Sequence, residues 1–291
     1  MFLKSLSPLR YPGGKSKISD LVKLIIQKAD VDGTYIEPFA GGAGVALYIL
    51  LNDIVNDIVI NDYDKAIYSF WRAIKEDGER FIDLINNTPV TVDEWKKQKD
   101  IYLNSRSYSL ELGFAAFFLN RTNRSGILTA GPIGGYEQNG IYKIDARFNK
   151  EALTKRIQEI IERKKNIHIY NKDIRRFITS IIPKYGDNSF VYLDPPYYNK
   201  GQQLYKNFLT SKDHAQIANL IFENIKCPWI VSYDDVNDIM RLYENYYTKR
   251  FEVNYSAANT GKSSELLIFS DLKLCPNVQE LLKSNVTTML Y

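Results

Sequence analysis

The sequence has few of the side chains that bind transition metals or form disulfides. Only two cysteines and two histidines occur among its 291 residues. Cys227 and Cys275 lie far apart with no second cysteine near either of them, so neither a disulfide framework nor a structural zinc site is expected. We therefore expect a cytoplasmic protein whose thiols stay reduced.

Long apolar runs and a strong net charge are also missing. No run reaches the length of about 18 apolar residues that a membrane span needs, and the N-terminal segment has no apolar stretch typical of a secretion signal. We therefore expect no membrane partner. The net charge of +4 is too small to indicate a nucleic-acid partner without clustering.

Short β-type runs alternate with helical patterns, which predicts an α/β protein with a parallel, doubly wound, Rossmann-like sheet. The β-type runs are residues 34–39, 58–62, 167–173, 190–194 and 229–235. Two further runs, residues 249–257 and 263–271, flank a turn-forming segment and predict a C-terminal antiparallel hairpin. In such folds ligands bind beyond the carboxyl ends of the strands.

The middle of the chain has a different pattern. Residues 76–165 contain helical pieces followed by a long stretch rich in Gly, Asn and Tyr, and a loop of that length is typically functional. We interpret residues 76–165 as an inserted, mainly helical subdomain. The sheet domain then comprises residues 1–75 and 166–291.

A glycine-rich segment from Phe39 to Gly44 follows the first strand and opens a helix. Residues without a Cβ atom let a ligand approach the backbone, and a helix N-terminus offers unpaired N–H groups. Asp62, at the end of the next strand, is suited to accept hydrogen bonds from ribose hydroxyls. The alternatives are a purely structural turn and a helix cap, although Asp64 is better placed to cap. Together the two features indicate a nucleoside-containing cofactor.

The apolar run at residues 190–193 is followed directly by Asp194, Pro195, Pro196 and Tyr197. Consecutive prolines remove backbone donors and restrict φ, so this segment predicts a rigid rim of acceptors. The Asp194 carboxylate and a proline carbonyl can both accept from one NH2 group, which orients the amine of adenine for attack on a methyl donor. Tyr197 offers a ring for an extruded base. The alternative is a plain strand terminator.

Other functions use the same residue types. RNA bases and protein glutamine amides also present a planar NH2 group that this acceptor pair suits. A non-catalytic module that binds DNA or S-adenosylmethionine (SAM) is a further alternative, which the complete Asp-Pro-Pro-Tyr segment disfavours. An NAD-linked enzyme is disfavoured because the glycine turn lacks the GxGxxG spacing and no histidine follows it closely.

Three segments, in the same order, resemble motifs of the Dam-type DNA adenine-N6 methyltransferases. Residues 10–17, RYPGGKSK, are similar to the N-terminal cofactor motif of that family, and residues 37–44, EPFAGGAG, to its glycine-rich motif. The third segment, DPPY at residues 194–197, is similar to the catalytic motif of the family. The resemblance spans nearly the whole chain and implies methyl transfer from SAM to N6 of a flipped-out adenine in double-stranded DNA.

The resemblance also implies which residues bind SAM. Lys15 would pair with the methionine carboxylate, Asp62 would hold the ribose, and Asp173 with Ile174 would contact the adenine. The family usually has an aromatic residue at the position of Ile174, and Asp173 by itself also suits a helix N-cap. The remaining cofactor-binding residues implied are Tyr11, Pro12, Gly13, Gly14, Glu37, Phe39, Ala40, Gly41, Gly42, Gly44 and Asp194. We expect no metal, because a sulfonium already activates its methyl group.

The segment at residues 117–126 is similar to the DNA-binding loop of that family. Asn120, Arg121, Asn123 and Arg124 suit contacts with phosphates and base edges, and Tyr136 suits stacking on DNA. The alternative is a surface loop capped by Asn and Ser. We expect a monomer or weak dimer, paired functionally rather than physically with a restriction endonuclease.

Overall fold

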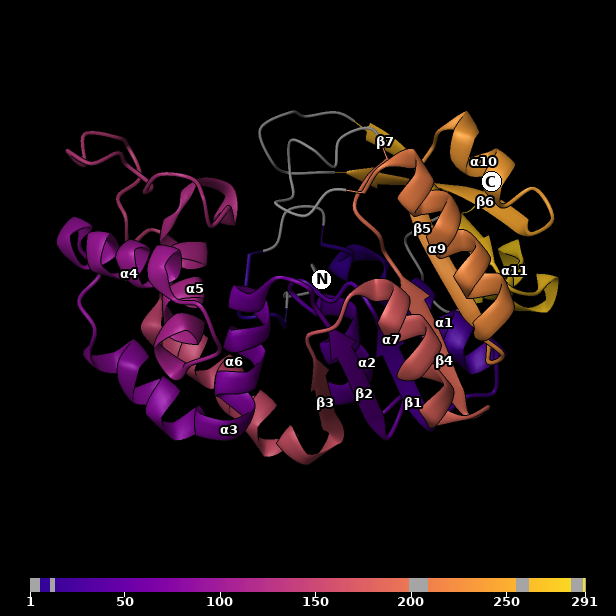
Figure 1. Ribbon diagram of the computed structural model, residues 1–291, viewed down its shortest axis with the longest axis horizontal. Coiled ribbons are helices and arrows are strands. Elements are labelled where there is room, and N and C mark those ends of the chain that lie inside the picture. Colours follow the sequence, from indigo (N-terminus) through magenta and orange to yellow (C-terminus); the bar gives the residue numbers. More distant parts are fainter. Residues whose placement is uncertain (1–5, 11–13, 199–208, 255–261, 284–289, 291) are drawn as a thin grey trace.

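One seven-stranded sheet organises the chain. The computed structural model describes residues 6–10, 14–198, 209–254, 262–283 and 290. The strand order is β3-β2-β1-β4-β5-β7-β6 (Figure 1). The strands are β1 (Thr34–Glu37), β2 (Asp57–Asn61), β3 (Ile167–Tyr170), β4 (Ser189–Leu193), β5 (Trp229–Asp234), β6 (Tyr247–Asn254) and β7 (Lys262–Phe269).

Strand direction follows the sequence prediction. β3, β2, β1, β4 and β5 pair in parallel, whereas β7 pairs antiparallel with both β5 and β6. The five parallel strands and the C-terminal hairpin are thereby confirmed as elements. The hairpin is not simply appended, because its second strand β7 lies between β5 and β6. Its turn, residues 255–261, lies outside the described residues.

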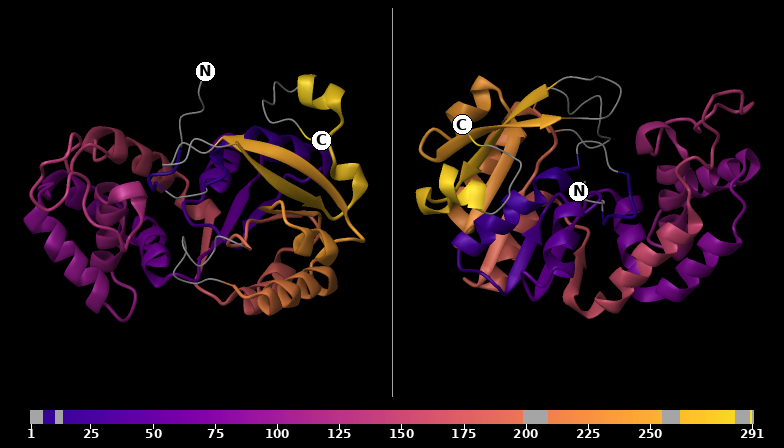
Figure 2. Two further views of the ribbon diagram at one scale, coloured as in Figure 1. Left: turned by 90° about the horizontal axis from the view of Figure 1, so that it is seen from above. Right: turned by 180° about the vertical axis from the view of Figure 1, so that it is seen from behind.

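Helices cover both faces of the sheet (Figures 1 and 2). The helices of the sheet domain are α1 (Ser19–Lys28), α2 (Gly44–Leu51), α7 (Ile174–Ser180), α9 (Ser211–Asn224), α10 (Asn237–Leu242) and α11 (Val278–Lys283). Short 3-10 helices are η1 (Ser16–Ile18), η2 (Arg124–Gly126), η3 (Lys164–Asn166), η4 (Ile182–Tyr185) and η5 (Leu272–Leu274). α1 and α2 pack on one face, and α7, α9 and α10 on the other.

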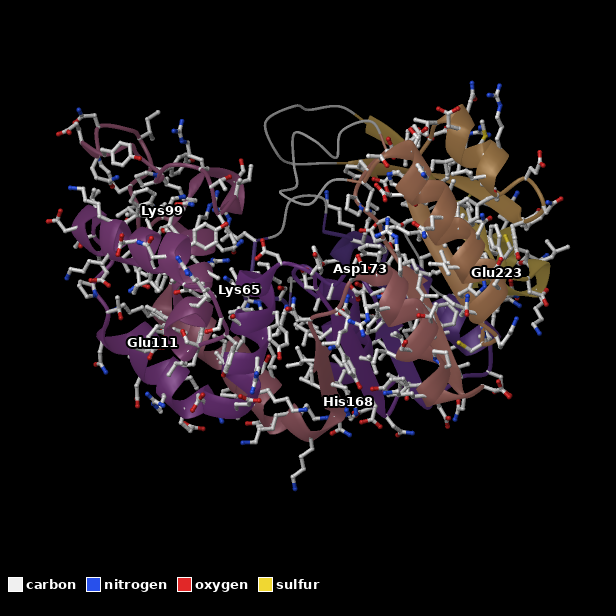
Figure 3. The ribbon with its side chains drawn as sticks, in the orientation of Figure 1. Lys65, Lys99, Glu111, His168, Asp173 and Glu223 are labelled. Atoms are coloured by element: carbon white, nitrogen blue, oxygen red, sulfur yellow. The ribbon has the colours of Figure 1, made fainter. Side chains whose placement is uncertain are left out.

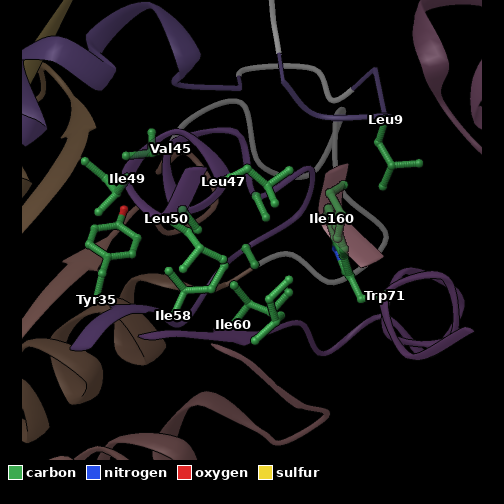
Figure 4. Close-up of a cluster of buried hydrophobic side chains, with 14 of the residues drawn as sticks. Leu9, Tyr35, Val45, Leu47, Ile49, Leu50, Ile58, Ile60, Trp71 and Ile160 are labelled. Carbon is green, nitrogen blue, oxygen red and sulfur yellow. The ribbon is translucent and has the colours of Figure 1, made fainter. Parts of the chain in front are cut away.

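Alternation along β4 explains why this strand reads as a continuous apolar run. Phe190 and Tyr192 belong to the core beneath α1 and α2, whereas Val191 and Leu193 belong to the core beneath α7 and α9. A parallel strand that is buried on both faces needs apolar residues at every position. Figure 4 shows the first core, in which residues of α2 pack on those of β1 and β2.

Four helices between β2 and β3 form the insertion, on the left of Figure 1. They are α3 (Lys65–Asn87), α4 (Val92–Asn104), α5 (Leu110–Thr122) and α6 (Lys150–Glu162). The predicted boundary after residue 75 falls within α3, next to a kink at Asp77, whose φ is −125°. Figure 3 shows Lys65, Lys99 and Glu111 on the helical part and Asp173 on the sheet domain.

No helix in the described part of the chain has the length and apolar character that crossing a membrane requires.

Candidate active site

The sequence-predicted residues of the sheet domain meet at its carboxyl edge. Chain order runs from β1 outward through β2 to β3 and then returns to β4 on the other side of β1. Such a reversal opens a crevice beyond the strand ends, where ligands of doubly wound folds bind. Glu37 ends β1, Asp62 follows β2, and Asp194 follows β4.

The glycine turn, residues Phe39 to Gly44, is held from three sides. The Gly41 N–H donates to Asp62 Oδ2 at 2.9 Å, and its carbonyl accepts from Trp71 Nε1 at 2.9 Å. Ser7 Oγ donates to the Gly42 carbonyl at 2.5 Å. Gly41 has a φ of 47°, a conformation that glycine adopts without a steric cost. The turn is therefore rigid before any ligand arrives.

Gly44 packs closely against η1 at the start of α2. A Cβ atom at this position would lie 2.2 Å from Ser16 Oγ, so a larger residue would require the Ser16 side chain to rotate. The N-terminal segment that carries Lys15 and the glycine turn are therefore packed directly together.

Glu37 stabilises the turn from below. Its Oε2 accepts from the Ala46 N–H and from the Tyr35 hydroxyl, each at 3.1 Å. It therefore caps the first turn of α2, where backbone donors lack intrahelical partners. Burial raises the pKa of Glu37 to about 8. The side chain is only 5% exposed, so its role here is to hold the turn rather than to touch a ligand.

Asp62 and Asp64 divide the two roles that the sequence left open. Asp64 Oδ1 accepts from the Ala66 N–H at 2.7 Å and caps α3. Asp62 is half-buried and accepts from the backbone N–H groups of Gly41 and Asp64, at 2.9 and 2.8 Å. Burial and the nearby Asp64 raise the pKa of Asp62 to about 7. Each carboxylate oxygen has further acceptor capacity, which suits the hydroxyls of a ribose.

The Asp194 carboxylate interacts with a lysine and a serine. Lys15 Nζ lies 2.8 Å from Oδ1 and 3.0 Å from Oδ2, and Ser232 Oγ donates to Oδ1 at 2.5 Å. A carboxylate oxygen accepts about two hydrogen bonds, so Oδ1 is fully used. Oδ2 keeps one acceptor position for a further donor.

Glu265 of β7 supports the other side of the Asp-Pro-Pro-Tyr segment. Its Oε1 accepts from the Tyr197 hydroxyl at 3.0 Å, and its Oε2 lies 3.5 Å from Lys15 Nζ. Asp234 Oδ1 accepts from the Tyr198 N–H at 2.8 Å. Asp194 to Tyr197, which we call the acceptor corner, is thus anchored by side chains from β5, β7 and the N-terminal segment.

Lys15 occupies a place that the sequence did not indicate. Burial alone would lower the pKa of Lys15, but the carboxylates of Asp194 and Glu265 raise it well above its usual value. The described side chains therefore place the carboxyl groups of Asp194 and Glu265 on either side of the Lys15 ammonium. The pairing of Lys15 with the cofactor carboxylate stays a prediction. Gly14, next to Lys15, is exposed. The other predicted residues of this segment lie outside the described residues, namely Tyr11, Pro12 and Gly13.

Asp173 takes the helix-capping role that was its alternative interpretation. Its Oδ1 accepts from the Arg175 N–H at 2.9 Å, at the start of α7, and Oδ2 lies 3.2 Å from Arg175 Nη1 (Figure 3 labels Asp173). Ile174 is buried in the core against which Phe39 packs. Ile174 therefore lies beneath the carboxyl edge as an apolar support rather than as an exposed stacking surface.

The DNA-binding prediction needs correction at two residues. Asn120 and Asn123 are 1% and 0% exposed. Asn120 brackets Arg10 by accepting from its N–H at 2.7 Å and donating to its carbonyl at 2.9 Å. Asn123 donates to the Ile127 carbonyl at 2.8 Å and accepts from Trp95 Nε1 at 2.6 Å. Both amides are used inside the protein, so we do not propose them as DNA contacts.

Three other residues of the insertion remain at its surface. Arg124 is exposed, and Tyr136 is 58% exposed while its ring packs edge-on against Trp95. Arg121 is half-buried and donates through Nε to the Arg147 carbonyl at 2.7 Å. They lie on the insertion and not beside the acceptor corner.

Sequence reasoning missed residues whose importance depends on tertiary contacts. Ser232 and Glu265 come from strands far along the chain, and nothing in their local sequence distinguishes them. Asn61 is also new: its amide donates to the carbonyls of Pro38 and Lys172, at 3.0 and 3.1 Å, and ties the ends of three strands together. Among the described residues no three His, Cys, Asp or Glu side chains could hold a metal ion together.

The site combines the glycine turn, Asp62 after the next strand, and the anchored acceptor corner. This combination is typical of a group-transfer enzyme that uses a nucleoside cofactor. The chain matches the family of D12 class N6 adenine-specific DNA methyltransferases over residues 11–258, and it belongs to that family. It is a site-specific enzyme that transfers a methyl group from SAM to N6 of adenine in DNA. The alternatives of an RNA or protein substrate and of a non-catalytic module are thereby set aside.

Known proteins similar to this chain include two type II methyltransferases. The match to M.MjaIII of Methanocaldococcus jannaschii is 28% identical over 205 residues and covers 65% of this chain and 68% of that protein. The match to M.CviBI of Paramecium bursaria Chlorella virus NC1A is 25% identical over 241 residues and covers 76% and 81%. A solved SAM-dependent methyltransferase from Agrobacterium tumefaciens is 9% identical with a TM-score of 0.42, covering 86% of this chain and 60% of that chain.

Proposed function

We propose that the acceptor corner receives an adenine flipped out of double-stranded DNA and orients its amine for methylation. The observation that carries this proposal is the acceptor position left on Asp194 Oδ2, beside a carboxylate oxygen that Lys15 and Ser232 already use. One N–H of the adenine amine would donate to Oδ2, and the other to a proline carbonyl of the corner. This turns the nitrogen lone pair toward the cofactor side.

Electrostatics supports the same assignment. When bound, SAM supplies a methyl group that its sulfonium activates. The amine gains positive charge as it attacks, and the Asp194 carboxylate, which accepts from it, stabilises that charge. Tyr197, whose hydroxyl Glu265 holds at 3.0 Å, offers its ring to the base. Incubating the protein with labelled SAM and duplex DNA should yield N6-methyladenine in the digested DNA; label in RNA or protein alone would reject the proposal.

The cofactor lies, in this proposal, along the carboxyl edge from Lys15 to Asp173. The residues present fit it, because the glycine turn is preformed and Asp62 has acceptor capacity beside it. Ala40, Gly41 and Gly42 would underlie the cofactor, Asp62 would accept from its ribose, and Phe39 with Ile174 would form the apolar wall near its adenine. Asp173 would contribute from the start of α7.

The affinity for SAM should depend on pH through Asp62. Because the pKa of Asp62 is about 7, its carboxyl is largely protonated below neutral pH and accepts ribose hydrogen bonds less well. We expect the Kd for SAM to rise about tenfold between pH 8 and pH 6. Isothermal titration calorimetry measures this.

Two variants isolate the contribution of Asp62. Asp62→Asn should bind more weakly at pH 8 and show little pH dependence. Glu37 also titrates near this range, with a pKa of about 8, so Glu37→Gln serves as the matched variant and should keep the wild-type slope. A slope that disappears in Glu37→Gln but not in Asp62→Asn would assign the effect to Glu37.

Tyr197 should act mainly through its ring. Tyr197→Phe keeps the stacking surface and loses the hydrogen bond to Glu265, so kcat should fall by less than about tenfold, as for one ordinary hydrogen bond. Tyr197→Ala removes base stacking worth about 1 to 3 kcal/mol, so its turnover should fall further than that of Tyr197→Phe. Single-turnover assays measure both losses. Equal losses in both variants would show that the hydroxyl matters and the ring does not.

We further propose that the insertion, residues 76–165, recognises the DNA target. Arg124 and Tyr136 are exposed. Arg121, three residues before Arg124, is half-buried. Ile141 and Tyr142 are 95% and 67% exposed, and exposed apolar side chains in a loop are suited to wedge between bases or stack on them. We also propose that the enzyme is a monomer or weak dimer, paired functionally rather than physically with a restriction endonuclease. Sequencing modified bases in a host that expresses the protein would identify the recognition site.

A further inference from the structure

Four arginines from four separate segments gather where the N-terminal segment meets the insertion. Arg10 belongs to the N-terminal segment, Arg121 to the end of α5, Arg147 to the segment before α6, and Arg156 to α6. The positive charges of the other three all act on Arg121. We call these four residues the arginine cluster.

The guanidinium groups of the arginine cluster bond only to backbone carbonyls within the described residues. Arg10 Nη1 donates to the Asn123 carbonyl at 3.3 Å, and Arg156 Nη1 donates to the Ser7 carbonyl at 3.4 Å. Arg121 donates to the Arg147 carbonyl. The Arg147 side chain itself is exposed. In the described part of the chain no acidic side chain forms an ion pair with any of the four.

This arrangement is electrostatically costly without an anion. Burial lowers the pKa of Arg121, and the charges of Arg10, Arg156 and Arg147 lower it further. A guanidinium nevertheless keeps its proton in proteins. The lowered pKa of Arg121 therefore indicates that no nearby negative charge in the described residues neutralises the positive charge of the cluster.

Specific contacts hold the arginine cluster in place. Asn120 fixes the backbone of Arg10 on both sides, and Gly126 packs so closely that a Cβ there would lie 2.3 Å from the Arg10 carbonyl oxygen. Ser7, which accepts from Arg156 through its carbonyl, also donates to the Gly42 carbonyl of the glycine turn. Short contacts therefore link the cluster to the cofactor side of the site.

We propose that the arginine cluster is a binding site for a backbone phosphate of the DNA substrate. Guanidinium groups have several N–H donors in a fork that matches phosphate oxygens, and most of those donors are not engaged by the carbonyl contacts. A phosphate held there would place the duplex against both the N-terminal segment and the insertion. The proposal rests on the DNA-methylating function and adds a sequence-independent contact that positions the duplex without reading bases.

The salt dependence of DNA binding tests the proposal. Removing one arginine that binds a phosphate should lower the slope of log K against log salt by about 0.9. Arg147→Gln is the first variant, because its exposed side chain makes no hydrogen bond to the described residues and its replacement should leave the fold intact. Arg147→Gln/Arg156→Gln should weaken DNA binding further, but its slope should fall by no more than about 0.9 in total, because both arginines serve the same single phosphate. Fluorescence anisotropy on duplexes of unrelated sequence measures the slopes.

The matched control is Arg241→Gln, on α10, whose side chain is 80% exposed and lies 3.9 Å from Asp238. Its slope should equal that of the wild type. The expected decreases in affinity are the same for every duplex sequence, with the Kd for SAM unchanged. An unchanged slope in the double variant, or a decrease restricted to the methylated target sequence, would overturn the phosphate site. Both outcomes are separate from a failure of the proposed function, which would appear as wild-type protein that leaves duplex DNA unmethylated.

Discussion

Asp194→Asn is expected to lower kcat for DNA methylation by about 100- to 1000-fold, the usual cost of losing one preorganised electrostatic group. Asparagine removes the negative charge and can turn an NH2 group toward the amine of the adenine. Lys15 keeps Glu265 as a partner at 3.5 Å, so the fold should persist. Single-turnover transfer of labelled methyl to duplex DNA measures the loss, and calorimetry should still detect SAM binding.

Asp187 provides the matched control for this variant. It lies two residues before β4 begins at Ser189, and it is exposed. Asp187→Asn therefore makes the same chemical change near the opposite end of the strand, away from the carboxyl edge, and should keep wild-type turnover. Normal methylation by Asp194→Asn, or a loss of SAM binding without a loss of kcat, would remove Asp194 from the catalytic role.

Lys15→Met is expected to lower the free energy of unfolding by about 3 kcal/mol, because removing one partner leaves a buried charge uncompensated. The Lys15 and Glu265 side chains are 4% and 1% exposed, whereas Asp194 is 21% exposed, which favours the lower end of the usual range. Turnover should fall as well, since Lys15 holds both oxygens of Asp194. Urea unfolding and steady-state kinetics measure the two effects.

The pH dependence of this effect has a defined sign. The pKa of Lys15 is raised in the folded protein, so its stabilising contribution is fully present below its unfolded pKa of about 10. The contribution is lost only as pH rises through the folded value. The titration of Lys15 itself should therefore add no pH dependence to the stability difference between wild type and Lys15→Met from about pH 6 to pH 9.

A double variant separates the charge effect from the packing effect. Lys15→Met/Glu265→Gln removes one of the two carboxylates that Lys15 neutralises, so it should recover part of the stability while methylation stays low. Lys23→Met, at a half-buried position on α1, is the control for replacing a lysine and should change neither property. A double variant less stable than Lys15→Met would show that charge compensation is not the main role of Lys15.

Local pattern was sufficient for the elements of the sheet and for the ligand-facing turns. The apolar runs ending near Glu37, Asp62 and Asp194 became β1, β2 and β4, because a strand buried on both faces needs apolar residues throughout. The assignment of Asp64 rather than Asp62 as the cap of α3 was also confirmed. A cap needs only a short polar side chain a few residues ahead of a helix, so this is a property of neighbouring residues.

Long-range partners could not be predicted in the same way. The chemistry of Asn120 and Asn123 suits DNA contacts, but burial commits both amides to backbone groups of the protein. Glu265 has no local signature, and it reaches Tyr197 only because β7 lies between β5 and β6. Hydrophobic periodicity says which face of an element is buried, but it does not say which polar groups meet across the molecule.

The sequence by itself indicated adenine methylation through the resemblance of residues 10–17, 37–44 and 194–197 to family motifs, and the family match confirms it. Such motifs are short, so a few consecutive residues specify each of them. The tertiary structure alone decided the charge state of the site. Lys15, Asp194 and Glu265 are far apart in the chain, and their energies depend on distance and burial, which exist only once the sheet has folded.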